Sequence, residues 1–150
     1  MIMKKGFTLM EFLIVAAIIL LLGTFAIIAF SNFNKKYILE DARTKVIEEL
    51  NYARSQTLGS EDRSSWGVRF EANRVIKFKG TSYNPADPSN LAVTLPSDTS
   101  ISSINLGGSI DVVFERLTGR TINTGSITIQ LLSNPMSSTT IKIYASGIAE

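Results

Sequence analysis

The sequence contains neither cysteine nor histidine. Without them the chain has no Ser-His-Asp or Cys-His catalytic group, no histidine general base, and no imidazole or thiolate ligand for a metal ion. It also lacks a Gly-x-Ser-x-Gly nucleophile elbow and a Gly-x-x-x-x-Gly-Lys-Ser/Thr phosphate-binding loop. We therefore expect no catalytic residue, no metal and no cofactor, and the chain is predicted not to be an enzyme.

A surplus of charge is also absent beyond the first few residues. Lysine and arginine number 15 and aspartate and glutamate 13, a net charge of +2. Lys4 and Lys5 account for the whole excess, because 15 − 2 leaves 13 basic residues against 13 acidic ones. The sequence pI of about 9.0 is thus no sign of a basic surface that binds a partner.

The acidic residues do not form the closely spaced set that binds calcium in a loop. A calcium site on Asp87, Asp98 or Asp111 is an alternative, but these aspartates are scattered along the sequence. No metal site is predicted from them.

No charged residue occurs from Phe12 to Phe30. About twenty apolar residues in a helix cover the roughly 30 Å of a bilayer's hydrocarbon core, so this stretch predicts one transmembrane helix. Lys4 and Lys5 precede it, and positive residues favour the cytoplasmic side. The expected topology is a single pass, with the N-terminus cytoplasmic and the C-terminal domain outside the cytoplasm.

One acid, Glu11, stands at the head of this apolar stretch. A charged side chain at the centre of a spanning helix costs roughly 2.5–3.5 kcal/mol, so an acid near such a helix usually has a partner or a task. The run from Lys4 to Glu11, Lys-Lys-Gly-Phe-Thr-Leu-Met-Glu, resembles the leader junction of type IV pilins and pseudopilins. The alternative is an interfacial acid in an unrelated single-pass protein.

The resemblance implies processing at the leader junction. A prepilin peptidase would cut between Gly6 and Phe7 and methylate the new amine of Phe7. That amine on one subunit could pair with Glu11 of a neighbour, because each charge would relieve the cost of burying the other. Glu11 is therefore the expected assembly residue.

Apolar residues continue beyond this stretch at spacings of three and four, which is the period of a helix that packs on a domain. They are Leu39, Ala42, Val46, Leu50 and Ala53, with Ile38 and Ile47 beside them. One helix from about Phe7 to Leu58 is predicted, ending near Gly59. Local unwinding at Gly23 during assembly is one hypothesis, and a packing glycine is the other.

The remainder alternates with the two-residue period of β-strands and is rich in β-branched residues. The predicted strands are Ser65–Phe70, Val75–Lys79, Leu91–Leu95, Ile101–Leu106, Ile110–Phe114, Ser126–Leu132 and Thr140–Ala145. Thr81 to Asn90 is predicted to be a surface loop. The expected domains are a leader at 1–6, a transmembrane and assembly helix at 7–30, its amphipathic continuation at 31–58 and an extracytoplasmic β-rich domain at 59–150.

Several segments of the β-rich part are similar to the minor pseudopilin H and FimT branch of the pilin family. They are Ser65–Phe70, Val75–Gly80, Gly119–Thr121, Ser126–Ile129 and Ala145–Ile148. The resemblance implies an α+β, pilin-like fold, with a long N-terminal helix, its first half transmembrane, packed on antiparallel β-sheet. Trp66 and Phe70 fall on one face of a strand and are expected in the core.

The predicted function is that of a structural minor subunit of a pilin-like filament, either a type II secretion pseudopilus or a type IV pilus. By the resemblance, its partners are other pilins or pseudopilins, the prepilin peptidase and an inner-membrane assembly platform. The resemblance also implies its localisation, which is the inner membrane in a single pass and then the pilus or pseudopilus.

Two functions of other classes are the alternatives. One is a DNA-uptake minor pilin that contacts DNA through Arg116, Arg120 and Lys142, although three cations would give weak, salt-dependent binding. DNA is therefore not the expected partner. The other is an unrelated single-pass protein with an extracytoplasmic binding domain.

Overall fold

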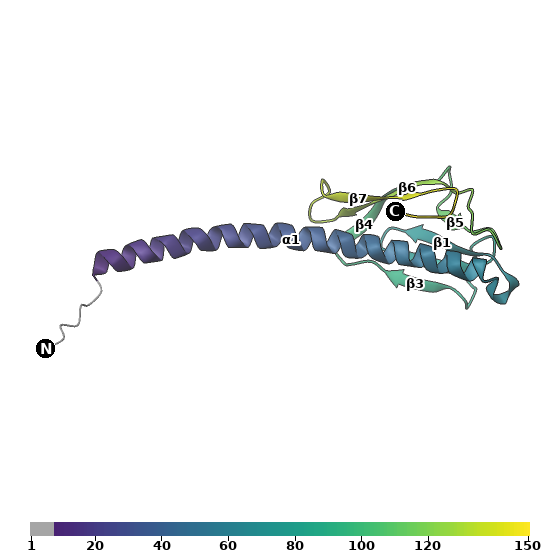
Figure 1. Ribbon diagram of the computed structural model, residues 1–150, viewed down its shortest axis with the longest axis horizontal. Helices are drawn as coiled ribbons and strands as arrows, with labels where there is room; N and C mark the ends of the chain where they lie inside the picture. The colour runs from purple at the N-terminus through teal and green to yellow at the C-terminus, as the bar shows by residue number, and fades with distance from the viewer. Residues whose placement is uncertain (1–7) are drawn as a thin grey trace. The chain divides into compact units, whose positions relative to one another are not determined.

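The computed structural model describes the backbone of residues 8–150 and the side chains of residues 8–23 and 33–150. The predicted leader at 1–6 and the cleavage site between Gly6 and Phe7 lie outside the described residues. Figure 1 labels the helix and most of the strands. In chain order the elements are α1 (Leu9–Leu58), a short 3-10 helix η1 (Glu61–Arg63), β1 (Trp66–Glu71), β2 (Arg74–Lys79), β3 (Leu91–Thr94), β4 (Thr99–Asn105), β5 (Asp111–Val113), β6 (Gly125–Leu131) and β7 (Ser138–Ile143).

The chain divides into two compact units, Met1–Lys36 and Tyr37–Glu150, which we call the first and second units. α1 contributes residues to both units and is continuous through Gly23. It ends at Leu58, directly before Gly59, as the sequence predicts.

Two antiparallel sheets make up the β-rich part of the second unit. The first has the strand order β3-β2-β1-β5 and the second the order β4-β6-β7. β1 and β2 form a hairpin in which Glu71 pairs with Arg74, so Ala72 and Asn73 make the turn. Each of the seven predicted strands is present, with its ends within two residues of the predicted ones.

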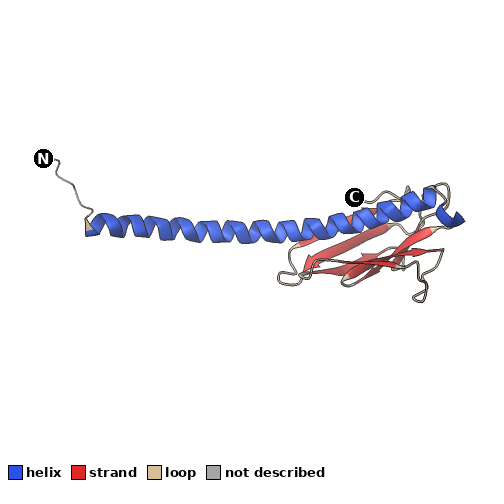
Figure 2. Cartoon of the chain, turned by 90° about the horizontal axis from the view of Figure 1, so that it is seen from below, coloured by secondary structure: helices blue, strands red, loops and turns tan. Residues whose placement is uncertain are grey.

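The core joins one face of α1 to both sheets. From the helix it contains the five residues that the spacing predicts, Leu39, Ala42, Val46, Leu50 and Ala53, with Ile38 and Ile47 packed beside them. From the strands it contains Trp66 and Phe70, as expected, together with aliphatic residues of the second sheet such as Ile127 and Ile141. Figure 2 shows the last turns of the helix lying along the strands. Burying each large apolar side chain contributes about 1.5–3 kcal/mol, so this shared core holds the second unit together.

The predicted fold class is wrong in its account of the helix. A long N-terminal helix packed on a sheet was expected, but only the part of α1 that belongs to the second unit, from Leu39 onward, contributes to the core. The residues of α1 in the first unit contribute nothing to that core among the described side chains.

The prediction of a transmembrane helix is also wrong. Across the residues that the structure describes, no helix combines the length and the apolar character that crossing a membrane requires. The single-pass inner-membrane localisation was inferred from that helix, so this prediction is wrong as well.

Candidate functional site

The described part of α1 in the first unit has an apolar surface on every side. Its large apolar residues do not follow the three-and-four spacing of a single stripe, because Phe12, Leu13, Ile14 and Val15 are consecutive. Eleven of them are exposed: Leu9, Met10, Phe12, Leu13, Ile14, Val15, Ile18, Ile19, Leu20, Leu21 and Leu22. A helix that is apolar all round is usually a buried one.

Glu11 lies in the first turn of α1, where the hydrogen bonds explain its position locally. The backbone N–H of Glu11 donates to Oγ1 of Thr8 over 3.2 Å, and the N–H of Phe12 donates to the carbonyl of Thr8 over 3.1 Å. Thr8 is therefore the N-cap, and Glu11 takes the third helical position, where an acid interacts favourably with the helix dipole.

This capping role was missed from the sequence, although its signal was present. Thr8 and Glu11 form a Thr-x-x-Glu pattern ahead of an apolar run, which is typical of a helix start. The Glu11 side chain is exposed, so its carboxylate is accessible to a second molecule.

The three predicted DNA contacts lie in separate parts of the second unit. Arg116 and Arg120 belong to the connection between β5 and β6, and Lys142 lies on β7. All three side chains are exposed, and within the described residues no contact brings them together. Two carboxylates, Asp111 and Glu115, line the same hollow as Arg120. The arrangement therefore gives no continuous basic surface.

That hollow has a volume of about 910 Å³ and lies beside the outer edge of β5. Its lining consists mostly of hydroxyl, amide and charged side chains, including Ser109, Asp111, Arg120, Thr121 and Asn123.

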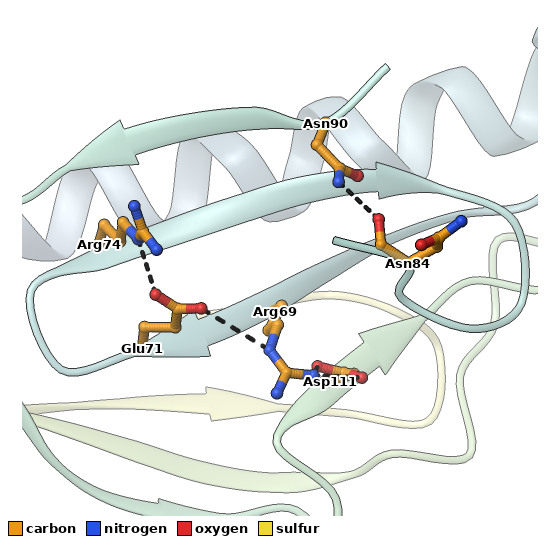
Figure 3. A network of polar contacts seen from close by, with 6 residues as sticks. All are labelled: Arg69, Glu71, Arg74, Asn84, Asn90 and Asp111. Atoms are coloured by element: carbon orange, nitrogen blue, oxygen red, sulfur yellow. Dashed lines mark hydrogen bonds and ion pairs between the residues drawn. The ribbon is translucent and has the colours of Figure 1, made fainter. Parts of the chain in front are cut away.

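A network of charged side chains lies on the first sheet, and Figure 3 shows it. Arg69 on β1 donates to both carboxylate oxygens of Asp111 on β5 over 3.2 and 3.3 Å, and Glu71 pairs with Arg74 over 2.7 Å. Burial raises the pKa of Asp111, although the guanidinium of Arg69 acts in the opposite direction. These contacts join β1 to the edge strand β5.

The predicted surface loop, Thr81 to Asn90, folds back over this network. The ring of Tyr83 meets the ring of Phe78 edge to face with centroids 5.6 Å apart, and the Arg69 guanidinium carbon lies 4.7 Å from the Tyr83 centroid. Phe78 is fully buried as a result. The loop is thus partly structural.

Lys77 on β2 is buried beneath α1, with only 4% of its surface exposed. Its Nζ lies 3.6 Å from the ring centroid of Tyr52 and 5.5 Å from that of Trp66. Burial lowers the pKa of Lys77 and raises the pKa of nearby Glu49. The Oε2 atom of Glu49 is buried and has no hydrogen-bond partner among the described residues. The two rings and the carboxylate together compensate the buried ammonium group.

Two of the glycine segments quoted for the family resemblance meet at the end of α1. The Nε of Arg54 donates to the carbonyl of Gly119 over 3.1 Å, and a Cβ at Gly147 would overlap that same carbonyl oxygen. Both glycines have positive φ, at 62° and 79°. The close packing explains both glycines by structure alone.

The three aspartates considered for calcium each have another partner. Asp87 accepts from Ser89, Asp98 accepts from Ser133 and Asp111 accepts from Arg69. In the described part of the chain, no group of three or more His, Cys, Asp or Glu side chains is placed to hold a metal ion.

Comparison with models of protein families, with curated proteins and with solved structures gives no match to this chain.

Proposed function

We propose that this chain is a non-enzymatic subunit of a pilin-like filament, either a type II secretion pseudopilus or a type IV pilus. In it, the N-terminal part of α1 bundles with the helices of other subunits. The observation that carries the proposal is the apolar surface of α1 between Leu9 and Leu22, which is exposed on all sides. A helix that is apolar all round is buried in its working state. Parallel helices of neighbouring subunits supply that cover.

The magnitudes favour association. Covering one large apolar side chain contributes about 1.5–3 kcal/mol. Eleven such side chains are 44–80% exposed on this part of the helix, so the gain from covering them is of the same order as the roughly 4–15 kcal/mol that association costs, or larger.

The leader resemblance supports the same role. Cleavage between Gly6 and Phe7 by a prepilin peptidase would create an amine one residue before the Thr8 cap. Glu11 of a neighbouring subunit would pair with that amine and set the register of the two helices. Other pilin or pseudopilin subunits, the peptidase and an assembly platform would be the partners.

Replacing Glu11 by glutamine tests this proposal. Glutamine also suits the third position of a helix, so Glu11→Gln removes the charge and keeps the cap. We expect the amount of chain in filaments sheared from the producing cells to fall at least about tenfold, which corresponds to about 1.4 kcal/mol of assembly energy. Immunoblotting of the filament fraction measures it.

Thr8→Ala is the matched control, because it weakens the cap by about 1 kcal/mol and leaves the charge. We expect it to assemble nearly normally. N-terminal sequencing of the filament fraction reports the processing site. Unimpaired incorporation of Glu11→Gln, or an intact Met1 in the filaments, would contradict the proposal.

A further inference from the structure

An edge strand presents unpaired backbone N–H and C=O groups, which pair with another chain unless something blocks them. The two sheets have four edge strands, β3 and β5 in the first sheet and β4 and β7 in the second. The four edge strands differ in whether their outward backbone groups are blocked. A second chain can pair only with an edge whose outward groups are free.

The edges of β5 and β4 are blocked. On β5 the outward N–H groups of Asp111 and Val113 donate to the side-chain oxygens of Ser109 and Asn123. On β4 the pairing shifts at a bulge between Ile101 and Ser103, and the N–H of Ile101 donates to the carbonyl of Ala72. The bulge breaks the regular alternation of the β4 edge, so neither of these two edges offers a regular ladder of unpaired groups.

The second half of β7 is blocked by the end of the chain. Lys142 and Glu150 exchange two backbone hydrogen bonds of 2.7 and 3.0 Å, and the N–H of Tyr144 donates to the carbonyl of Ile148 over 3.0 Å. This added segment stops at Lys142, so it does not cover residues 138–140.

Two edge segments remain open, and the alternation of the ladder shows which groups they offer. Leu95 bonds inward to the Asn73 carbonyl, so the N–H and C=O groups of Ala92 and Thr94 point outward. By the same alternation from Lys142, those of Ser138 and Thr140 point outward from β7. Within residues 8–150, no hydrogen bond is made by these outward groups.

The two open segments match each other. Each offers two residues at positions i and i+2, and neither Leu91–Thr94 nor Ser138–Thr140 contains a charged residue. In an antiparallel register that places Ala92 opposite Thr140 and Thr94 opposite Ser138, every outward group finds a partner in four hydrogen bonds. Val93 and Thr139 are β-branched residues, which suit a strand pair.

We propose that β3 of one copy of this chain adds to the first half of β7 of a second copy, as an antiparallel pair in this register. The two surfaces differ, so the contact is head-to-tail and repeats from copy to copy. A filament needs such a contact, and the inference rests on the proposed function for that arrangement. Four hydrogen bonds are too few to hold two copies alone, so the pair forms where the helices already hold the copies together.

Engineered cysteines test the register, since the chain has none of its own. Residues in a hydrogen-bonded antiparallel pair have Cα atoms about 5.5 Å apart, within the range of a disulfide. Filaments of the Ala92→Cys/Thr140→Cys variant should give a ladder of cross-linked chains on a non-reducing gel after mild oxidation. The Thr94→Cys/Ser138→Cys variant should give the same ladder.

Two controls locate the contact. Ala92→Cys/Ser138→Cys is out of register and should give less than about a tenth of the ladder. Thr94→Pro removes one outward N–H group of β3 and leaves the hydrogen bonds between β3 and β2 intact. When Thr94→Pro is added to the Ala92→Cys/Thr140→Cys variant, the cross-linked bands on the gel should disappear. Thr94→Ser in the same variant should leave these bands unchanged. Fluorescence of Trp66, the one tryptophan, confirms that each variant is folded.

The outcomes separate this pairing from the filament proposal. Filaments without a ladder from either in-register pair overturn the pairing and leave the filament. If no filaments form, the filament proposal fails, and the pairing fails with it, because it needs the helices to hold the copies together. Dimers from Ala92→Cys alone indicate that β3 pairs with β3, which also overturns the proposal.

Discussion

At the scale of single residues, the close packing of two backbone segments leaves no room for a side chain at Gly147. Its φ is 79°, and an added Cβ would overlap the Gly119 carbonyl oxygen and lie 2.9 Å from the Nε of Arg54. That carbonyl already accepts the hydrogen bond from Arg54. The side chain of alanine would therefore compete with the contact that holds the end of α1.

We expect Gly147→Ala to destabilise the protein by about 2–4 kcal/mol, part from the left-handed backbone and part from the overlap. Gly107→Ala is the control, because Gly107 also has a positive φ, 66°, but its Cβ would meet nothing within 4 Å. It should cost only about 1 kcal/mol. Urea denaturation followed by Trp66 fluorescence measures both. Equal losses in the two variants would show that the overlap is relieved at no cost.

At the scale of elements, Thr57 connects the last turn of α1 to the start of β1. Its side chain is fully buried, and its Oγ1 donates to the Ala53 carbonyl over 2.8 Å and accepts from the Trp66 N–H over 3.0 Å. The hydroxyl thus pairs a backbone N–H that no other group reaches within the described residues.

Thr57→Val keeps the shape and removes both hydrogen bonds, so it leaves the Trp66 N–H buried and unpaired. We expect a loss of about 1–3 kcal/mol in the free energy of unfolding. Thr57→Ser keeps the hydroxyl and loses one methyl group, which costs about 0.8 kcal/mol. If Thr57→Ser proves as costly as Thr57→Val in the same urea titration, the hydroxyl does not connect the two elements.

The elements themselves were predictable from local patterns. The spacing of Leu39, Ala42, Val46, Leu50 and Ala53 gave the buried face of α1, and period-two alternation gave all seven strands. Contacts between distant segments were not predictable in this way. Nothing near Lys77 in the sequence indicates that Tyr52 and Trp66 will face it, because their meeting depends on how the helix lies on β2.

In the candidate site too, features that depend on local sequence were predictable and contacts between distant residues were not. Glu11 was found from a local motif, whereas its Thr8 cap was missed because the acid was interpreted only as a buried charge. The spanning helix was inferred from the charge-free run Phe12–Phe30, and the described residues contain no helix that meets the requirement. The pairing of Arg69 with Asp111, 42 positions apart, needed the sheet order.

At the scale of the whole molecule, the burial of two acids contributes to the pH dependence of stability. Burial raises the pKa of both Glu49 and Asp111. A carboxyl whose pKa is raised on folding binds more protons in the folded chain than in the unfolded one between the two pKa values. Its contribution to stability is full below the unfolded pKa, about 4, and is lost as the pH rises through the folded pKa.

We therefore expect the second unit to gain stability as the pH falls from 7 towards 5, as far as these two groups decide it. Glu49→Gln should reduce that gain, because glutamine does not titrate. Glu115→Gln is the control, since that exposed carboxylate accepts from Thr118 and a glutamine can do the same. Urea midpoints at several pH values give the slopes. A slope unchanged in Glu49→Gln would remove Glu49 as its source.

The Thr8 cap bears on how a precursor could become a mature subunit. The helix begins at Leu9, and the hydrogen bonds that start it come from Thr8, which follows the expected cut by one position. Within the described residues, the hydrogen bonds that start the helix therefore come from a residue that the cut would keep. Maturation would therefore change the chain's charge and its N-terminus and would keep the threonine that caps the helix.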